Sequence, residues 1–193
     1  MARTKSFDER LVLKKALNLF WAKGYHATSI QDLVDHLKIN RASIYSTWGD
    51  KHNLYLETLK LYRKINSNWL LELVRSAKPA HEILANFLQY AIDESQPDQV
   101  PNGCYLVNAT TELAHTNSDV DELVTDYKET VIKVLSAIIE DGKTQGQITS
   151  KHSSLDLATS IFSIANGLRI MKQSNTDSRN LQVTVKIALS VLD

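Results

Sequence analysis

A chain of 193 residues with only three prolines and six glycines is long enough to bury a core in one or two small domains and favours helix throughout. Its single cysteine excludes a disulfide-stapled extracellular scaffold, and no run of 18 apolar residues occurs, so we expect a soluble, cytoplasmic protein without a membrane span. Formal charge is zero, but nine bases accompany five acids in residues 1–51 and thirteen accompany seventeen in the remainder, which suits a protein that meets phosphates with one end.

The first helix is expected to begin near Phe7, because Ser6 and Glu9 have the spacing of a capping box. Gly24 is typical of the residue that ends such a helix. Four apolar residues are expected on its inner face: Leu13, Ala16, Leu17 and Phe20. This helix would brace the two helices that follow.

Two short helices are predicted between residues 28 and 48. Thr28 and Gln31 have the spacing of a second capping box, and a buried face follows at helical spacing, made of Ile30, Leu33, Val34 and Leu37. Asn40 is a residue type that caps the next helix. Two short helices joined by a turn of about four residues form a helix-turn-helix, whose second helix enters the DNA major groove by its N-terminal end.

A long fourth helix is predicted after Asp50, running from Lys51 towards Val74. Pro79 is expected to begin a fifth helix, Asn102 to cap a sixth over 103–116, and Ser118 with Asp121 to start a seventh that ends near Gly142. An eighth helix over 154–173 and a ninth over 177–192 complete the list. The prediction is an all-α protein of about nine helices, with a three-helix DNA-binding domain over 1–50 and a helical body over 51–193.

The helix-turn-helix segment resembles the TetR family of bacterial repressors over about the first third of the chain. The resemblance is carried by Thr28-Ser29-Ile30, by Ala42-Ser43-Ile44-Tyr45, and by Trp48-Gly49-Asp50-Lys51 followed by Leu54. The sequence departs from the family pattern at Lys38, Thr47 and Gly49. The resemblance implies a transcriptional regulator that binds a double-stranded DNA operator, usually as a repressor, and is released by a small-molecule effector or by thiol modification.

The resemblance also implies which residues contact DNA. Base contacts are expected from the turn Asn40 to Ser43, with Arg41 on a guanine edge, and phosphate contacts from hydroxyls, a phenol and a helix-end lysine. Trp48 is interpreted as an anchor between the helices. The candidate DNA-binding residues are Thr28, Ser29, Asn40, Arg41, Ala42, Ser43, Tyr45, Ser46, Thr47 and Lys51.

An effector pocket in the body is likewise implied, lined by aromatic residues and a few polar groups. The candidates are Tyr62, Trp69, Phe87, Tyr90, Cys104, Tyr105, Asn108, Tyr127 and Phe162. Gly103-Cys104-x-x-x-Asn108 followed by Glu112-Leu113-Ala114 is similar to a NemR-like subgroup of electrophile and redox sensors, which would make Cys104 a reactive thiol. The alternative is that Cys104 is a small buried residue beside the pocket.

Helices eight and nine are apolar around more than one face, so we expect them to pair with a twin subunit as a homodimer, with a wholly intramolecular core as the alternative. No cofactor or metal is expected, because the chain has no HExxH motif and no second cysteine. Two other classes stay open. One is a DNA-bound helical interaction protein without an effector, and the other is a helical-bundle enzyme with a metal on Glu112 and His115.

Overall fold

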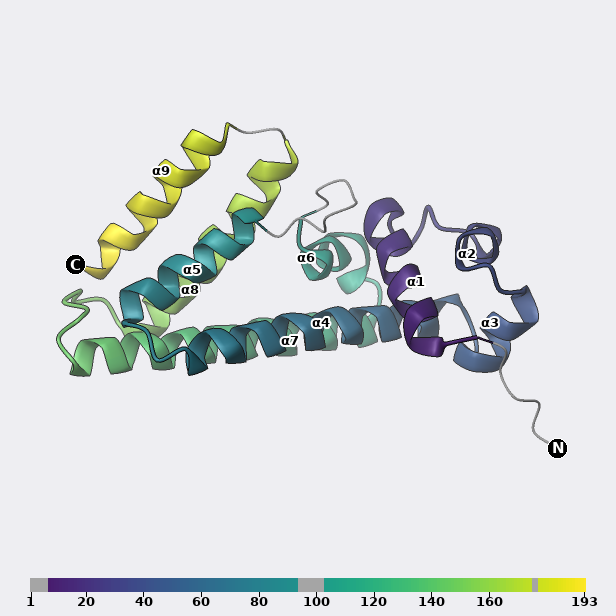
Figure 1. Cartoon of the computed structure of the whole chain (residues 1–193), viewed down its shortest axis with the longest axis horizontal. Coiled ribbons are helices and arrows are strands. Elements are labelled where there is room, and N and C mark those ends of the chain that lie inside the picture. Colours follow the sequence, from purple (N-terminus) through teal and green to yellow (C-terminus); the bar gives the residue numbers. More distant parts are fainter. Residues whose placement is uncertain (1–6, 94–102, 175–176) are drawn as a thin grey trace. The chain divides into compact units, whose positions relative to one another are not determined.

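The computed structural model describes residues 7–93, 103–174 and 177–193 of the chain. All regular structure in these ranges is helical, with nine α-helices, one π-helical turn and one 3-10 turn (Figure 1). This confirms the expected all-α fold. None of the helices in the described ranges is both long enough and apolar enough to cross a membrane.

The chain divides into two compact units, each built from two separate segments. Unit 1 contains the residues up to Ile65 together with Tyr105–Val124, and unit 2 contains Asn66–Cys104 together with Thr125–Asp193. Residues 51–65 and 105–124 therefore belong to the same compact unit as residues 7–50, so the predicted boundary after residue 50 falls within unit 1.

Unit 1 contains three short helices, parts of two long ones, and a broken helix. They are α1 (Glu9–Lys23), α2 (Ile30–Leu37), α3 (Arg41–Trp48), the start of α4 (Lys51–Arg75), α6 (Tyr105–Ala109), the π turn η1 (Thr110–Ala114) and the start of α7 (Ser118–Thr144). Their buried residues include the aliphatic Leu33, Leu37, Ile44, Leu54 and Leu59 and the aromatic Phe20, Tyr55, Tyr62 and Tyr105. The predicted sixth helix over 103–116 is thus two pieces, α6 and η1.

Asp8 begins α1, because its carboxylate accepts hydrogen bonds from the backbone amides of Arg10 and Leu11. The predicted cap at Ser6 lies outside the described residues. Gly24 ends the helix, as predicted, at a φ of 85° that residues with a side chain rarely adopt. Ala16, Leu17 and Phe20 are buried on the inner face, as predicted. The fourth buried residue is Val12, whereas the predicted Leu13 is only half-buried.

Unit 2 is a bundle in which α5 (Ala80–Asp93) packs against both α8 (Ser154–Gln173) and α9 (Ser178–Leu189), and α8 packs against α9 (Figure 1). A 3-10 turn, η2 (Ser190–Leu192), ends the chain. The core joins these helices to the second halves of α4 and α7. Gly142 of α7 allows a close approach to α5, since a Cβ there would lie 2.7 Å from the Cβ of Ala80.

The predicted starts of four body helices agree with the structure to within one residue, while the cap of α7 differs from the predicted one. Ser153 caps α8 and Asp177 caps α9, while Pro79 accepts the first hydrogen bond of α5 through its carbonyl. At α7 the side chain of Asn117, one residue before the predicted Ser118, accepts from the amide of Val120. The predicted cap at Asn102 lies outside the described residues.

Candidate nucleic-acid interface

The N-terminal end of α3 faces solvent. Asn40 caps the helix as predicted, and its side chain accepts from the amide of Ser43 at 2.8 Å. Asn40, Arg41 and Ala42 are exposed, and Ser43 is half-buried. Ile44 is the one fully buried side chain of α3 and fixes the helix to unit 1. The helix therefore presents its polar and small residues outward while one apolar residue holds it in place.

Arg41 is held by a neighbour one turn further along α3. Its guanidinium donates to the hydroxyl of Tyr45 at 3.3 Å and lies 5.5 Å from the centroid of the Tyr45 ring. Spacing of four residues places two side chains on the same face of a helix. The exposed end of α3 thus presents a cation that is partly oriented before any ligand arrives.

Ser29, not Thr28, caps α2. The Ser29 hydroxyl accepts from the amide of Asp32 at 3.0 Å, and the Asp32 carboxylate accepts from the Ser29 amide at 2.7 Å, which completes a capping box. Lys23 of α1 forms an ion pair with the same carboxylate at 2.7 Å. The hydrogen bond from Lys23, followed by those from Ser29, holds the pKa of Asp32 well below its ordinary value.

Thr28 lies one residue before the cap and is fully buried, with its hydroxyl donating to the carbonyl of Gly24 at 2.6 Å. The predicted box with Gln31 is wrong because Thr28 serves the turn instead of the helix. Between α2 and α3, Lys38 adopts the left-handed conformation at a φ of 57°. A residue with a side chain adopts that conformation at a cost of roughly 1–2 kcal/mol.

Lys51 and Glu112 both bind the turn between α1 and α2. The Lys51 ammonium donates to the carbonyls of Tyr25 and Thr28, each at 2.8 Å. The Glu112 carboxylate accepts from the amides of Tyr25 at 2.9 Å and His26 at 2.7 Å. Burial lowers the pKa of Lys51, and the nearby charge of Glu112 opposes that effect. Sequence reasoning missed this role of Glu112, because its partners are more than 80 residues away and no local pattern indicates them.

The remaining predicted DNA-contact residues lie on the second half of α3. Tyr45 is 37% exposed, and Ser46 is exposed with its hydroxyl donating to the Ser43 carbonyl. Thr47 is half-buried, and its hydroxyl oxygen is buried without a hydrogen-bond partner. Trp48 is half-buried, and its ring contacts that of Phe7, which precedes α1, with centroids 6.3 Å apart.

The predicted effector-pocket residues fall into two groups. In unit 1, Tyr62 and Tyr105 lie 5.8 Å apart between ring centroids, and Trp21, which was not predicted, packs against both. The Tyr105 hydroxyl bonds to that of Thr58 at 2.8 Å, and burial raises the pKa of Tyr105 well above its ordinary value. Asn108 is half-buried on the same helix as Tyr105.

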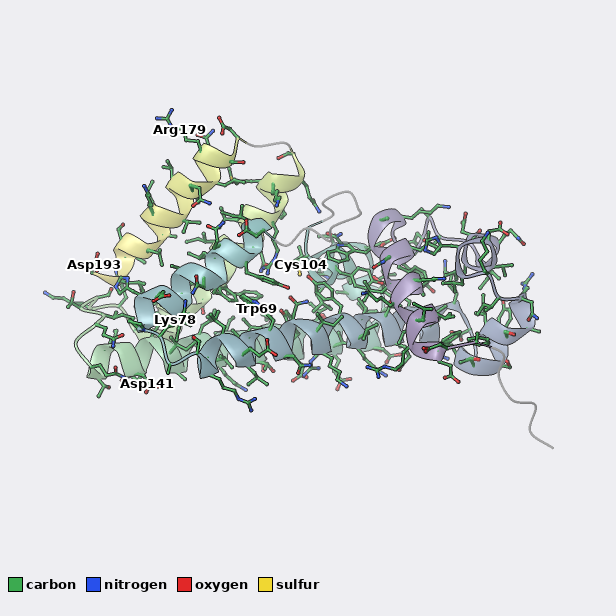
Figure 2. All side chains as sticks on the ribbon, viewed as in Figure 1. Trp69, Lys78, Cys104, Asp141, Arg179 and Asp193 are labelled. Atoms are coloured by element: carbon green, nitrogen blue, oxygen red, sulfur yellow. The ribbon has the colours of Figure 1, made fainter. Side chains whose placement is uncertain are left out.

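In unit 2, Trp69 stacks on Tyr90 with ring centroids 3.7 Å apart and also contacts Phe87. Tyr127 and Phe162 pack against the unit 2 core, and Cys104 is buried with 5% of its surface exposed. A separate surface pocket of about 400 Å³ lies between the α4–α5 turn and the end of α7, where Lys78 and Asp141 line it (Figure 2). None of the predicted effector residues lines that pocket.

Glu112 and His115 do not form a metal-binding pair. The Glu112 carboxylate is bonded to two backbone amides, and His115 is exposed. Across the described part of the chain, no group of three or more His, Cys, Asp or Glu side chains is arranged to hold a metal ion. The arrangement instead offers an exposed helix end with amide, hydroxyl and guanidinium groups, which are the groups that read DNA base edges and phosphates.

Comparison with known proteins agrees with this arrangement. Residues 12–58 match the family model for bacterial regulatory proteins of the tetR family, and residues 80–188 match that for the tetracyclin repressor-like C-terminal domain. The uncharacterized HTH-type transcriptional regulator YezE of Bacillus subtilis is 30% identical, with all of both chains covered. The HTH-type transcriptional repressor ComR of Escherichia coli is 25% identical over 98% of this chain and 90% of ComR.

Among solved structures, a cysteine mutant of the TetR family transcriptional regulator CifR, in complex with 26 bp double-strand operator DNA, superposes with a TM-score of 0.86. It is 23% identical, and the match covers 100% of each chain. Since CifR is this distant in sequence, the superposition supports the fold, while the family models and the full-length relative carry the assignment. On this evidence the chain belongs to the TetR family of helix-turn-helix transcriptional regulators.

Proposed function

We propose that this regulator is a homodimeric repressor that binds a double-stranded DNA operator through α3 and leaves it when a small molecule binds the body. The observation that carries the proposal is the exposed first turn of α3, where Asn40, Arg41 and Ala42 face solvent behind a single buried anchor. The relative ComR is named a transcriptional repressor, and the structure of CifR has been solved in complex with operator DNA. Repression and operator binding therefore both have a precedent among similar proteins.

The contact residues divide by exposure in this proposal. Arg41 reads a guanine edge, because guanidinium groups bond well to its two acceptors in the major groove. The hydroxyls of Ser29, Tyr45 and Ser46 contact phosphates. Three further predicted residues, Thr28, Thr47 and Lys51, are partly or fully buried, and we assign them to holding the turn and the helix.

The dimer is proposed to form through α8 and α9. Both helices leave large apolar side chains on the surface of the single chain, among them Ile170 at 54% exposure and Ile187 at 64%. Exposed apolar residues concentrated on two neighbouring helices are typical of a protein interface. Two α3 helices in such a dimer would meet half-sites one duplex turn apart, roughly 34–36 Å.

The effector is proposed to be small and largely apolar, because the predicted pocket residues are mostly aromatic. The rings of Trp69, Phe87 and Tyr90 form the unit 2 group, and Tyr62 with Tyr105 the unit 1 group. Thiol modification of Cys104 is the second proposed route of release. Only 5% of the Cys104 surface is exposed, so a reagent reaches it only when the surrounding side chains move.

Selection of bound sequences from random double-stranded DNA tests the DNA-binding part of this proposal and supplies an operator. On the selected operator, Arg41→Ala is expected to weaken binding by about 1–3 kcal/mol, which is roughly 5- to 150-fold. Arg75→Ala is the matched control, because Arg75 is an exposed arginine at the end of α4 in unit 2. Equal losses in the two variants would remove Arg41 from the contact set.

A panel of small apolar molecules and a mild electrophile, titrated against the protein on its selected operator, tests release. Release by a member of the panel would support the effector, and release that requires Cys104 would support the thiol route. DNA affinity that no compound or oxidant changes would favour the alternative, a DNA-bound helical interaction protein.

A further inference from the structure

Glu112 lies in the middle of η1, yet its carboxylate binds the turn that leads into the helix-turn-helix. It accepts from the amides of Tyr25 and His26, and a Cβ on Gly24 would lie 3.2 Å from both of its carboxylate oxygens. A side chain at position 24 would therefore crowd the carboxylate. All these residues belong to unit 1, so the contact is internal to one compact body. We call the Glu112 carboxylate with its two amide partners the Glu112 clip.

Two charges bind this turn, the carboxylate of the Glu112 clip and the ammonium of Lys51, and each lies at an unfavourable end of a helix. Glu112 meets the C-terminal end of α1 at Gly24, where the helix dipole is negative, and Lys51 is the first residue of α4, where the dipole is positive. Both charges are nonetheless held, because Glu112 bonds to amides and Lys51 to carbonyls of the same turn. The hydrogen bonds from Glu112 and Lys51 to this turn therefore offset the unfavourable interaction of each charge with a helix dipole. Those hydrogen bonds form only while the turn keeps its conformation.

The backbone that carries Glu112 is irregular. Residues Thr110–Ala114 form a π turn directly after the five residues of α6. A π turn within a helix holds one extra residue and is common at functional sites. Conversion of that turn to α-helix would change the register by one residue, which is about 100° of rotation and would turn Glu112 away from its amide partners.

The other end of this segment carries Tyr105, seven residues before Glu112. Its ring packs against Tyr62 and Trp21, and its hydroxyl bonds to that of Thr58. At 1.5 Å per residue the two side chains are separated by roughly 10 Å along the helix axis. Anything that displaces Tyr105 therefore acts on the same short segment that holds the clip.

We propose that Glu112 is a positioning residue for DNA binding: its clip fixes the turn before α2 in the DNA-binding form, and loss of the clip lowers DNA affinity. This inference rests on the proposed function and adds to it the connection between the segment that carries Tyr105 and the DNA-binding helices. The arrangement predicts that DNA affinity changes in the opposite direction from the usual one when this negative charge is removed. Removal of a negative charge ordinarily strengthens binding to DNA, whereas removal of this one weakens it.

The test compares Glu112→Gln with Glu122→Gln in the full-length protein. Glu122 is an exposed acid in the same unit, so both variants lose one negative charge from unit 1. Glu112→Gln is expected to speed amide hydrogen exchange at Tyr25, His26 or both by about tenfold or more, because the neutral Gln side chain offers one acceptor oxygen where the carboxylate offers two, and its NH2 group cannot accept from an amide. Its affinity for the operator selected above is expected to fall, while that of Glu122→Gln stays equal or rises.

Hydrogen exchange at Leu135, a buried residue of unit 2, controls for global stability and should not change in either variant. Should Glu112→Gln fail to fold, Glu112→Asp is compared with Glu122→Asp, because both variants keep the charge and only the first withdraws a carboxylate from the two amides by one methylene. Wild-type protein that selects no operator would refute the proposed function. Wild-type binding combined with equal affinities for Glu112→Gln and Glu122→Gln would refute the role of the clip and leave the proposed function intact.

Discussion

Replacing Ile44 with alanine is expected to detach α3 from unit 1. Ile44 is 0% exposed and is the one buried residue of α3, an eight-residue helix. The substitution removes three carbon atoms, which is about 2.4 kcal/mol of lost burial, and the cavity raises the total cost to about 2–5 kcal/mol. Isolated helices shorter than roughly 12–15 residues are marginal in water, so α3 depends on this anchor to stay folded.

The assay combines urea unfolding with amide hydrogen exchange of residues 41–48. Exchange in these residues is expected to accelerate more than exchange in the core of unit 2, and operator binding is expected to fall with it. Ile65→Ala is the matched control, because Ile65 is 44% exposed on α4 and loses much less burial. If Ile44→Ala and Ile65→Ala destabilise the protein equally, the single-anchor description of α3 is wrong.

Two further predictions concern acid and association. Because Lys23 and Ser29 hold the pKa of Asp32 below its ordinary value of 3.8, the bonds of Asp32 stabilise α2 fully above pH 3.8 and are lost as pH falls below it. Exchange of the α2 amides should therefore accelerate below that pH, and Asp32→Asn should abolish the pH dependence without changing the rates in α8. Ile187→Glu, at a side chain 64% exposed on α9, is expected to convert a dimer to a monomer, since a carboxylate would be buried in the interface. Sedimentation velocity would measure this, and an unchanged mass would place the interface elsewhere.

Local patterns predicted those parts of the structure that depend on neighbours in the sequence. Asn40 and Asp50 were identified as caps because an amide or carboxylate three residues before a free backbone amide can bond to it, and both do so here. The fold class followed in the same way from helical spacing of apolar residues. The exposed end of α3 was predicted for the same reason, since its anchor and its cap lie within the same short segment.

Predictions failed where several residues fit one pattern and distant contacts decided between them. Thr28 and Ser29 are both good caps, but Thr28 is buried and bonds to Gly24, which leaves Ser29 as the cap of α2. At α7 two adjacent residues also fit the cap pattern, and Asn117 takes that position while Ser118 is the first residue of the helix. Glu112 had no local signal at all, because its amide partners lie on the turn after α1. The break of the sixth helix into α6 and a π turn was likewise hidden, since the residues there all fit an α-helix.

The attachment of α3 through Ile44 has a consequence for how such a protein can acquire new targets. Because one side chain secures the helix, substitutions at Arg41 or Ala42 leave the packing of unit 1 unchanged. The surface that recognises a promoter can therefore diverge, or be redesigned, largely independently of the thermodynamic stability of the scaffold. A library that randomises the exposed positions of α3 while keeping Ile44 should yield folded variants with altered sequence preference.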